Sequence, residues 1–214
     1  MDKPLARRIV CFGDSITHGA EFELAQRWTS LLQQKLDAWQ PGLWQVHNRG
    51  VGGNTSAQGF DRFAADVLLQ LPAVVLVQFG FNDANVYNWA TAPRIGLSEY
   101  IENLHEFHRL ITSRGGECIF IINHTIGAIE GRQGNGQSYS ANFALYETAL
   151  RDLVSQLHAS SIDLPAKMRD AGASLESFLA EDGLHLSAEG NGLYADLVFD
   201  ALKQHLSHTL QQAI

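Results

Sequence analysis

Three short stretches of this chain are continuously apolar, and they constrain the fold more than any other feature. They cover residues 9–12, 74–77 and 119–122. A strand with one face in water alternates apolar and polar residues, whereas a strand covered on both faces reads as one apolar run. The three runs therefore indicate a parallel sheet that is covered by helices on both faces.

Helical periodicity fills the intervals between the strand-like stretches. Strands are expected at residues 8–12, 44–48, 73–78, 117–123 and 161–164, and helices at residues 28–39, 98–113, 142–157 and 187–206. Ser98, Ser140 and Ser187 are expected to cap the last three helices. The alternation predicts one three-layer α/β/α domain over residues 1–214, with a doubly wound, parallel, five-stranded, flavodoxin-like sheet.

Composition and charge narrow the possible partners. The 214-residue chain has a net charge of −8, which disfavours nucleic acid and a stable association with an anionic membrane surface. Residues 1–8 carry no apolar signal region, and no segment reaches the roughly 20 apolar residues that span a bilayer. We therefore expect a cytoplasmic protein. The sequence does not indicate an oligomeric state.

A serine closely follows the first predicted strand. Gly13 ends the apolar run, and Ser15 stands where a helix is expected to begin, at the edge where open α/β sheets bind ligands. Taken alone, this position suits a helix cap equally well. Asp182 and His185, three residues apart near the other end of the chain, supply the carboxylate and imidazole that activate a serine hydroxyl. Together the three residues predict a nucleophilic serine.

Ester hydrolysis also requires hydrogen-bond donors for the oxyanion that develops on the acyl carbonyl. Residues 50–53 contain three glycines, whose backbone N–H groups can approach a ligand closely, although a tight turn before a helix capped by Thr55 explains them equally well. Asn82, shortly after the third predicted strand, can supply a side-chain amide. Asp14 and Asp83 are expected to hold loops through hydrogen bonds with the backbone.

Four short blocks resemble those of the SGNH/GDSL hydrolase superfamily, and they occur in the order that is typical of the family. The blocks are Gly-Asp-Ser at 13–15, a glycine before Asn54-Thr55, Gly-Phe-Asn-Asp at 80–83 and Asp-x-x-His at 182–185. Each block alone is a weak signal, whereas four in order span nearly the whole chain and are specific. Many relatives carry a proline-rich turn after the fourth strand, where this chain reads Asn-His-Thr at 123–125.

The resemblance implies roles for individual residues. Ser15 would be the nucleophile and His185 the general base, with Asp182 orienting the imidazole. The backbone N–H groups of Ser15 and Gly53 and the side chain of Asn82 would form the oxyanion hole.

We therefore expect a serine esterase that cleaves small carboxylic esters through an acyl-enzyme and needs no metal or cofactor. The same apparatus would serve an acetyl-sugar esterase, an acyl thioesterase or a lysophospholipase. A catalytically silent ligand-binding module and a flavin- or nucleotide-binding domain are the alternatives from other classes. The chain contains no G-x-S-x-G motif, which disfavours the larger α/β-hydrolase family.

Four residues beside the predicted machinery are candidates for contact with the substrate. They are Asn54, Phe81, His124 and Leu184. For His124, a role as a pocket-lining spectator is an equally good interpretation.

Overall fold

The computed structural model describes residues 7–212, with side chains for residues 7–207. Residues 1–6, on which the predicted location partly depends, lie outside this range. Five parallel strands form one sheet, in the order β2-β1-β3-β4-β5. The strands are β1 (Arg7–Gly13), β2 (Trp44–Gly50), β3 (Val74–Gln78), β4 (Glu117–Ile122) and β5 (Ser160–Asp163). This order is flavodoxin-like and confirms the predicted fold class.

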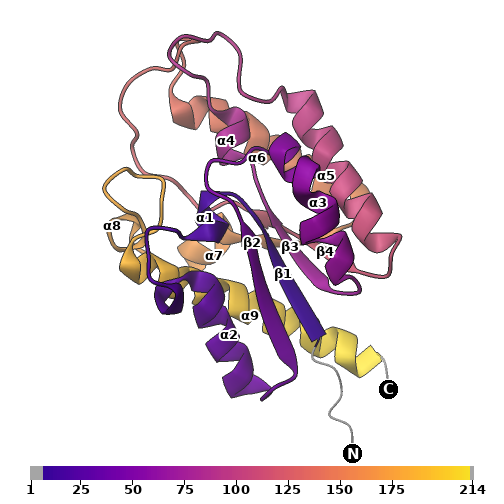
Figure 1. The fold of residues 1–214 in the computed structure, drawn as a ribbon. Coiled ribbons are helices and arrows are strands. Elements are labelled where there is room, and N and C mark those ends of the chain that lie inside the picture. The colour runs from indigo at the N-terminus through magenta and orange to yellow at the C-terminus, as the bar shows by residue number, and fades with distance from the viewer. Residues whose placement is uncertain (1–6, 213–214) are drawn as a thin grey trace, which may run out of the picture.

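Helices cover both faces of the sheet (Figure 1). One layer contains α2 (Trp28–Trp39) and α9 (Ala188–Gln212), and the opposite layer contains α3 (Ser56–Asp66), α5 (Leu97–Thr112) and α6 (Tyr139–Leu157). In the sheet, β2 lies on one side of β1 and β3 lies on the other, so the direction of the strand order reverses between β1 and β3. Ligands of open α/β sheets bind at such a reversal, outside the carboxyl ends of the strands.

Several short helices were not predicted from the sequence. They are α1 (Ser15–His18), α4 (Phe81–Ala84), α7 (Leu164–Asp170) and α8 (Leu175–Phe178), together with 3₁₀ turns at Leu24–Gln26 and Leu68–Gln70. Helices of one or two turns offer too few residues for an apolar period to be visible. Both α1 and α4 begin at the carboxyl edge of the sheet, where they follow β1 and β3.

The apolar runs of the sequence form the buried centre of the sheet. Phe12, fully buried at the end of β1, meets the rings of Phe63, Phe79 and Phe107 edge-on, at centroid distances of 5.6, 5.2 and 5.5 Å. Aromatic pairs prefer this geometry, which adds about 0.5–1.5 kcal/mol per pair to the burial of their area. The strand that precedes the serine is therefore held rigidly from the α3 and α5 side.

Two of the predicted serine caps are wrong. Helix α6 begins three residues earlier than expected, because Ser138 rather than Ser140 accepts the hydrogen bond from the Ala141 amide, at 3.1 Å. Ser98 lies inside α5, which begins after a glycine without a side-chain cap. Ser187 does cap α9, since its Oγ accepts from the backbone N–H three residues ahead, at 2.8 Å. Serines two positions apart, such as Ser138 and Ser140, compete for the same role, and local geometry decides between them.

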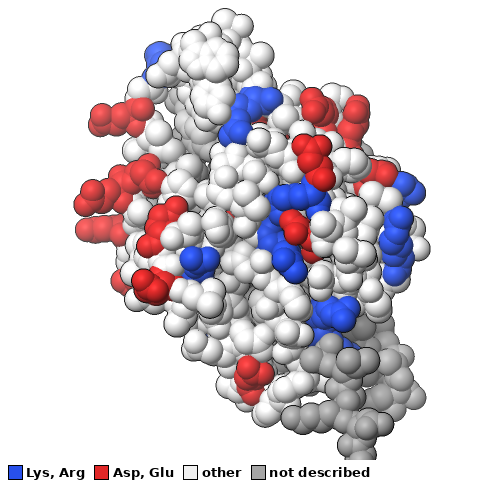
Figure 2. Space-filling view, viewed as in Figure 1, with Lys and Arg blue, Asp and Glu red and all other residues white. Residues whose placement is uncertain are grey.

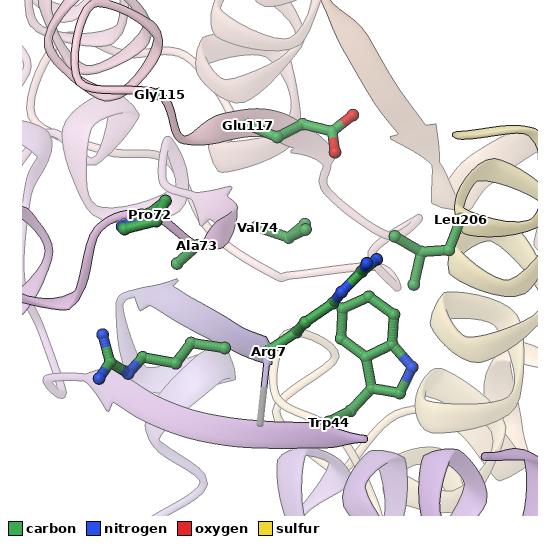
Figure 3. Close-up of a pocket in the computed structure, with 9 residues that line it drawn as sticks. Arg7, Trp44, Pro72, Ala73, Val74, Gly115, Glu117 and Leu206 are labelled. Atoms are coloured by element: carbon green, nitrogen blue, oxygen red, sulfur yellow. The ribbon is translucent and has the colours of Figure 1, made fainter. Parts of the chain in front are cut away.

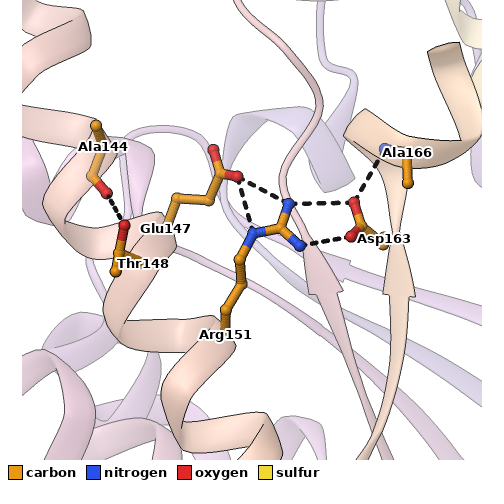
Figure 4. Close-up of polar contacts among 6 residues, drawn as sticks. All are labelled: Ala144, Glu147, Thr148, Arg151, Asp163 and Ala166. Carbon is orange, nitrogen blue, oxygen red and sulfur yellow. Dashed lines mark hydrogen bonds and ion pairs between the residues drawn. The ribbon is translucent and has the colours of Figure 1, made fainter.

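One ion-pair network ties α6 to the edge strand β5 (Figure 4). The Arg151 guanidinium donates to both carboxylate oxygens of Asp163 and to Oε1 of Glu147, one turn away on α6. Asp163 Oδ1 also accepts from the Ala166 amide at 3.0 Å and so caps α7. The hydrogen bonds from Arg151 hold the pKa of Asp163 below its usual value, although partial burial opposes this shift.

Charges are mixed over the surface. On the face seen in Figure 2, Lys and Arg side chains alternate with Asp and Glu, and acidic side chains gather along one edge. Among the described helices, none combines the length and the apolar character that a bilayer crossing needs.

Candidate active site

The three residues predicted to form a triad meet at the carboxyl edge of the sheet. Ser15 opens α1 directly after β1, and its Oγ lies 2.9 Å from Nε2 of His185. The other ring nitrogen of His185, Nδ1, lies 2.6 Å from Oδ2 of Asp182. Asp182 and His185 come from the loop before α9, and His185 lies 170 residues from the serine. The fold thus brings residues from both ends of the sequence into one hydrogen-bonded row of side chains.

The cap of α1 is Asp14, so the interpretation of Ser15 as a helix cap is wrong. Asp14 Oδ1 accepts the hydrogen bond from the Ile16 amide at 3.0 Å. The Ser15 hydroxyl is therefore not used by the backbone and faces the imidazole. Asp14 is fully buried, and burial raises the pKa of its carboxyl to about 7, although the bond from Ile16 opposes this. Its predicted role as a loop holder is confirmed.

Asp182 is held by three hydrogen bonds. Its Oδ1 accepts from the backbone N–H groups of Leu184 and His185, each at 2.9 Å, and its Oδ2 faces Nδ1 of the imidazole. Partial burial opposes ionisation, but these bonds outweigh it and keep the pKa of the carboxyl below its usual value. An ionised carboxylate only accepts, so Nδ1 carries a proton. In the neutral imidazole, Nε2 is then the acceptor for the Ser15 hydroxyl.

His124 supports this loop from the interior. It is fully buried, and its ring Nε2 lies 2.8 Å from the carbonyl oxygen of Leu184, between the two predicted triad residues of the loop. Its ring packs against Phe81 and Phe178, at 5.1 and 5.5 Å between centroids. Burial lowers the pKa of His124 to about 4, so the ring is neutral and Nε2 donates to the carbonyl. His124 Nδ1 is buried with no hydrogen-bond partner.

Besides the Ser15 N–H, the predicted oxyanion donors come from the turn after β2 and from the one-turn helix α4. Gly53 is in the turn after β2, with a φ of +74° that favours glycine. Asn82 is the second residue of α4, and its Nδ2 lies 3.4 Å from Asp14 Oδ2, next to the serine. Arg94 connects the two loops, since it donates to Asn82 Oδ1 at 3.2 Å and to the Gly53 carbonyl at 3.0 Å. Arg94 thus connects the Gly53 peptide with the Asn82 side chain, and the role of the two residues as oxyanion donors stays a prediction.

Asp83 fixes the loop that carries Asn82. Its Oδ1 accepts from both the backbone N–H and the hydroxyl of Ser56 on α3, at 2.8 and 2.5 Å, and its Oδ2 accepts from the Gly80 amide at 3.2 Å. Burial raises the pKa of Asp83, against the effect of these bonds. Its predicted role as a loop holder is confirmed, and α3 and α4 are tied together next to the site.

Two of the residues proposed to contact the substrate are covered in this structure. Phe81 is 2% exposed and packs against the ring of Phe143, and His124 is covered completely. Asn54 is half-buried, with its Oδ1 bound to Arg62 Nε at 2.8 Å. Leu184 is half-buried and borders a cavity. A contact of any of the four with substrate stays a prediction.

The cavity beside the predicted triad has a volume of about 290 Å³, and most of the residues that line it carry a polar or charged side chain. Asp182 and Leu184 form one wall, Asn85 comes from the loop after α4, and Glu130 and Gln133 come from the loop before α6. A small hollow against Ser15 and His185 has room for about 10 Å³. This hollow is far smaller than the cavity beyond the predicted triad.

A second cavity, of about 350 Å³, lies at the opposite end of the sheet (Figure 3). Its lining comes from the amino ends of the strands and from α9, and includes Arg7, Trp44, Val74, Glu117 and Leu206. It holds none of the predicted site residues. Open parallel sheets bind ligands at the carboxyl ends of their strands, so the cavity of about 290 Å³ is the candidate substrate site.

Two arginines near the site were missed by reasoning from the sequence. Arg62 donates to the carbonyls of Gly13 and Arg49 and to Asn54, and so ties the ends of β1 and β2 to α3. Arg94 makes the contacts described above. Their partners lie up to 49 residues away in sequence, and no local pattern reveals such pairs.

The fold and the hydroxyl–imidazole–carboxylate arrangement of the site are typical of a class of hydrolases. The profile of the GDSL-like Lipase/Acylhydrolase family matches residues 11–193, which shows that the chain belongs to this family. A crystal structure of the lipase/acylhydrolase from Enterococcus faecalis is similar to the chain, with a TM-score of 0.75 and 26% identity over 93% of this chain and 96% of that one.

Two relatives extend the comparison. The uncharacterized lipoprotein YqeF of Bacillus subtilis (strain 168) is 31% identical over 146 residues, which cover 66% of this chain and 56% of that protein. An isoamyl acetate-hydrolyzing esterase 1 homolog from Bos taurus is 28% identical over 207 residues, 86% of this chain and 76% of that protein. The match thus spans little more than half the length of the bacterial relative.

Proposed function

We propose that residues 1–214 form a single-domain serine esterase that hydrolyses small carboxylic esters through an acyl-enzyme. The observation that carries this proposal is the chain of hydrogen bonds from Ser15 Oγ to His185 Nε2 and from His185 Nδ1 to Asp182, at 2.9 and 2.6 Å. In this arrangement a neutral imidazole can take the hydroxyl proton, and a carboxylate stabilises the imidazolium that forms.

The reaction runs in two halves. His185 takes the proton of Ser15 as Oγ attacks the acyl carbon, and then delivers that proton to the leaving alkoxide, so that an alcohol departs and an acyl-enzyme remains. Water then attacks the acyl carbon, gives its proton to His185, and the proton returns to Ser15 Oγ as the carboxylic acid leaves. In both halves the negative charge on the carbonyl oxygen is met by the Ser15 and Gly53 N–H groups and by the Asn82 amide.

Small acyl groups are favoured by the small hollow at the serine, and polar alcohols by the side chains around the larger cavity. The bovine relative is named for hydrolysis of an acetate ester, which supports the same acyl class. An acetyl-sugar esterase would show a steep preference for acetyl over butyryl esters, and a thioesterase would prefer acyl-CoA to oxygen esters. A cytoplasmic location stays a prediction, since one relative is a lipoprotein.

The test is hydrolysis of p-nitrophenyl esters from acetate to decanoate by the wild type, Ser15→Ala and a matched Ser155→Ala control. Ser155 is exposed near the carboxyl end of α6. We expect activity with short chains in the wild type and control, and its loss by several orders of magnitude in Ser15→Ala. Equal traces from the wild type and Ser15→Ala would overturn the proposal and favour a ligand-binding role.

A further inference from the structure

Arg94 contacts several segments around the site, although it belongs to none of the sequence motifs. Its guanidinium donates to Asn82 Oδ1 at 3.2 Å, to the Gly53 carbonyl at 3.0 Å and to Gln58 Oε1 at 3.3 Å. Its cationic end also lies 5.6 Å from the centre of the Tyr87 ring. One side chain therefore touches the loop after β2, the first turn of α3 and the loop after β3.

The contact with Asn82 decides which way that amide faces. A guanidinium has only donors, so it must meet the amide oxygen of Asn82 and never its nitrogen. The nitrogen is then turned to the side of Asp14, where one of its hydrogens faces Asp14 Oδ2 at 3.4 Å. Nδ2 carries a second hydrogen, which is available to an acyl oxygen at Ser15. The hydrogen bond from a cation also polarises the amide and makes its N–H a stronger donor.

The contact with Gly53 fixes the other loop. The turn is exposed, and glycine is the residue with the widest choice of backbone angles, so the direction of its N–H is weakly determined by the turn alone. The bond from Arg94 to the Gly53 carbonyl restricts the peptide planes around this residue. Arg62 also donates to the side chain of the neighbouring Asn54, at 2.8 Å, so two arginines bind this loop.

We propose that Arg94 is a positioning residue for the oxyanion hole, where its guanidinium holds the Asn82 amide and the Gly53 peptide so that donors from two separate loops meet one acyl oxygen. The inference rests on the proposed function. Preorganised donors need no rearrangement when charge develops, and this is the source of their catalytic effect. Arg94 acts through Asn82 and Gly53 and does not itself touch the reacting atoms.

The test is a double-mutant cycle between Arg94→Met and Asn82→Ala, with kcat and KM measured on p-nitrophenyl acetate. Removing one oxyanion donor costs about 10²–10³-fold in kcat, and losing only its orientation costs less, so we expect about 10–100-fold for Arg94→Met with a much smaller change in KM. In the double variant the loss should be smaller than the product of the two single losses, because Arg94 has lost the amide through which it acts.

A second variant and a matched control keep the test decisive. Arg94→Lys keeps the charge and the apolar stem but loses the planar set of donors, so it should still lower kcat by about 5–10-fold even where Arg94→Met fails to fold. Arg109→Met is the control, since Arg109 is exposed on α5 and pairs with Glu106; it should leave kcat unchanged.

Unchanged kcat in both Arg94 variants would overturn the proposal, as would losses that multiply in the double variant. A wild type no more active than Ser15→Ala is a different outcome, because it would refute the proposed function itself.

Discussion

His124 links the stability of the fold to the loop that carries Asp182 and His185, and His124→Gln tests this link. Glutamine keeps an N–H donor at a similar distance for the Leu184 carbonyl but does not titrate. In the structure the ring is fully buried, its Nε2 is bound to Leu184 at 2.8 Å and its Nδ1 has no hydrogen-bond partner. Protonation would place a charge and an unpaired donor in an aromatic cluster, which is why the fold disfavours it.

The magnitude follows from the pKa of His124 in the two states. Burial lowers this pKa to about 4 in the folded protein, against about 6.5 in an unfolded chain. Between these pH values the native state therefore binds fewer protons than the unfolded state. The free energy of unfolding does not suffer from His124 above about pH 6.5, and it falls as pH is lowered from 6.5 toward 4. A difference of about 2.5 pKa units corresponds to about 3 kcal/mol.

The measurement is urea denaturation of the wild type and His124→Gln at several pH values between 7 and 4. The free energy of unfolding of the wild type relative to the variant should fall by about 3 kcal/mol over this range. Asp14 has a raised pKa of about 7 and contributes the opposite slope, because its stabilising effect falls as pH rises from about 4 to 7. Both proteins contain Asp14, so the difference isolates His124. A difference that does not change with pH would refute the reasoning.

Three further predictions concern catalysis, packing and surface charge. Asp182→Asn should lower kcat by up to about 10⁴-fold with little change in the melting temperature, because an amide no longer fixes the protonated Nδ1; a loss below tenfold in ester assays would contradict this. Gly13→Ala should cost about 1–3 kcal/mol in urea denaturation, because its Cβ would lie 2.4 Å from Thr17 Oγ1, and unchanged stability would contradict the close approach. Arg151→Met should cost about 1 kcal/mol or less, with a difference that shrinks in high salt and as low pH protonates Asp163; a loss that salt does not alter would argue against an ionic cause.

The sheet was predictable because its strands are covered on both faces. Continuous apolar runs such as residues 74–77 have few competing interpretations once turn signals bound them. The structure confirms all five expected strands, to within one residue at each end except for β2, which continues two residues further than expected. Helix starts were less predictable: Ser138 and Ser140 are chemically the same cap, and the sequence does not show that Ser138 is the one used.

The residues of the predicted triad could be chosen from the sequence because each belongs to a short motif at a strand end or loop. The residues that hold the loops around them could not be chosen from the sequence. Arg62 and Arg94 bind the backbone carbonyls of Gly13 and Gly53, which lie 49 and 41 residues away, and a backbone carbonyl carries no sequence signal. The buried amides of Gln78 and Asn123, bound to each other at 2.8 Å beneath the site, left a weak signal, since both end apolar runs with a polar residue.

The central claim is that Ser15 is a nucleophile activated by His185, and covalent labelling tests it most directly. The wild type, Ser15→Ala and His185→Ala would be treated with a p-nitrophenyl phosphonate, and intact mass and peptide mapping would locate the adduct. We predict one adduct on Ser15 in the wild type, none in Ser15→Ala, and labelling slowed by orders of magnitude in His185→Ala. A wild type that hydrolyses esters but carries the adduct on another residue, or carries none, would contradict the account.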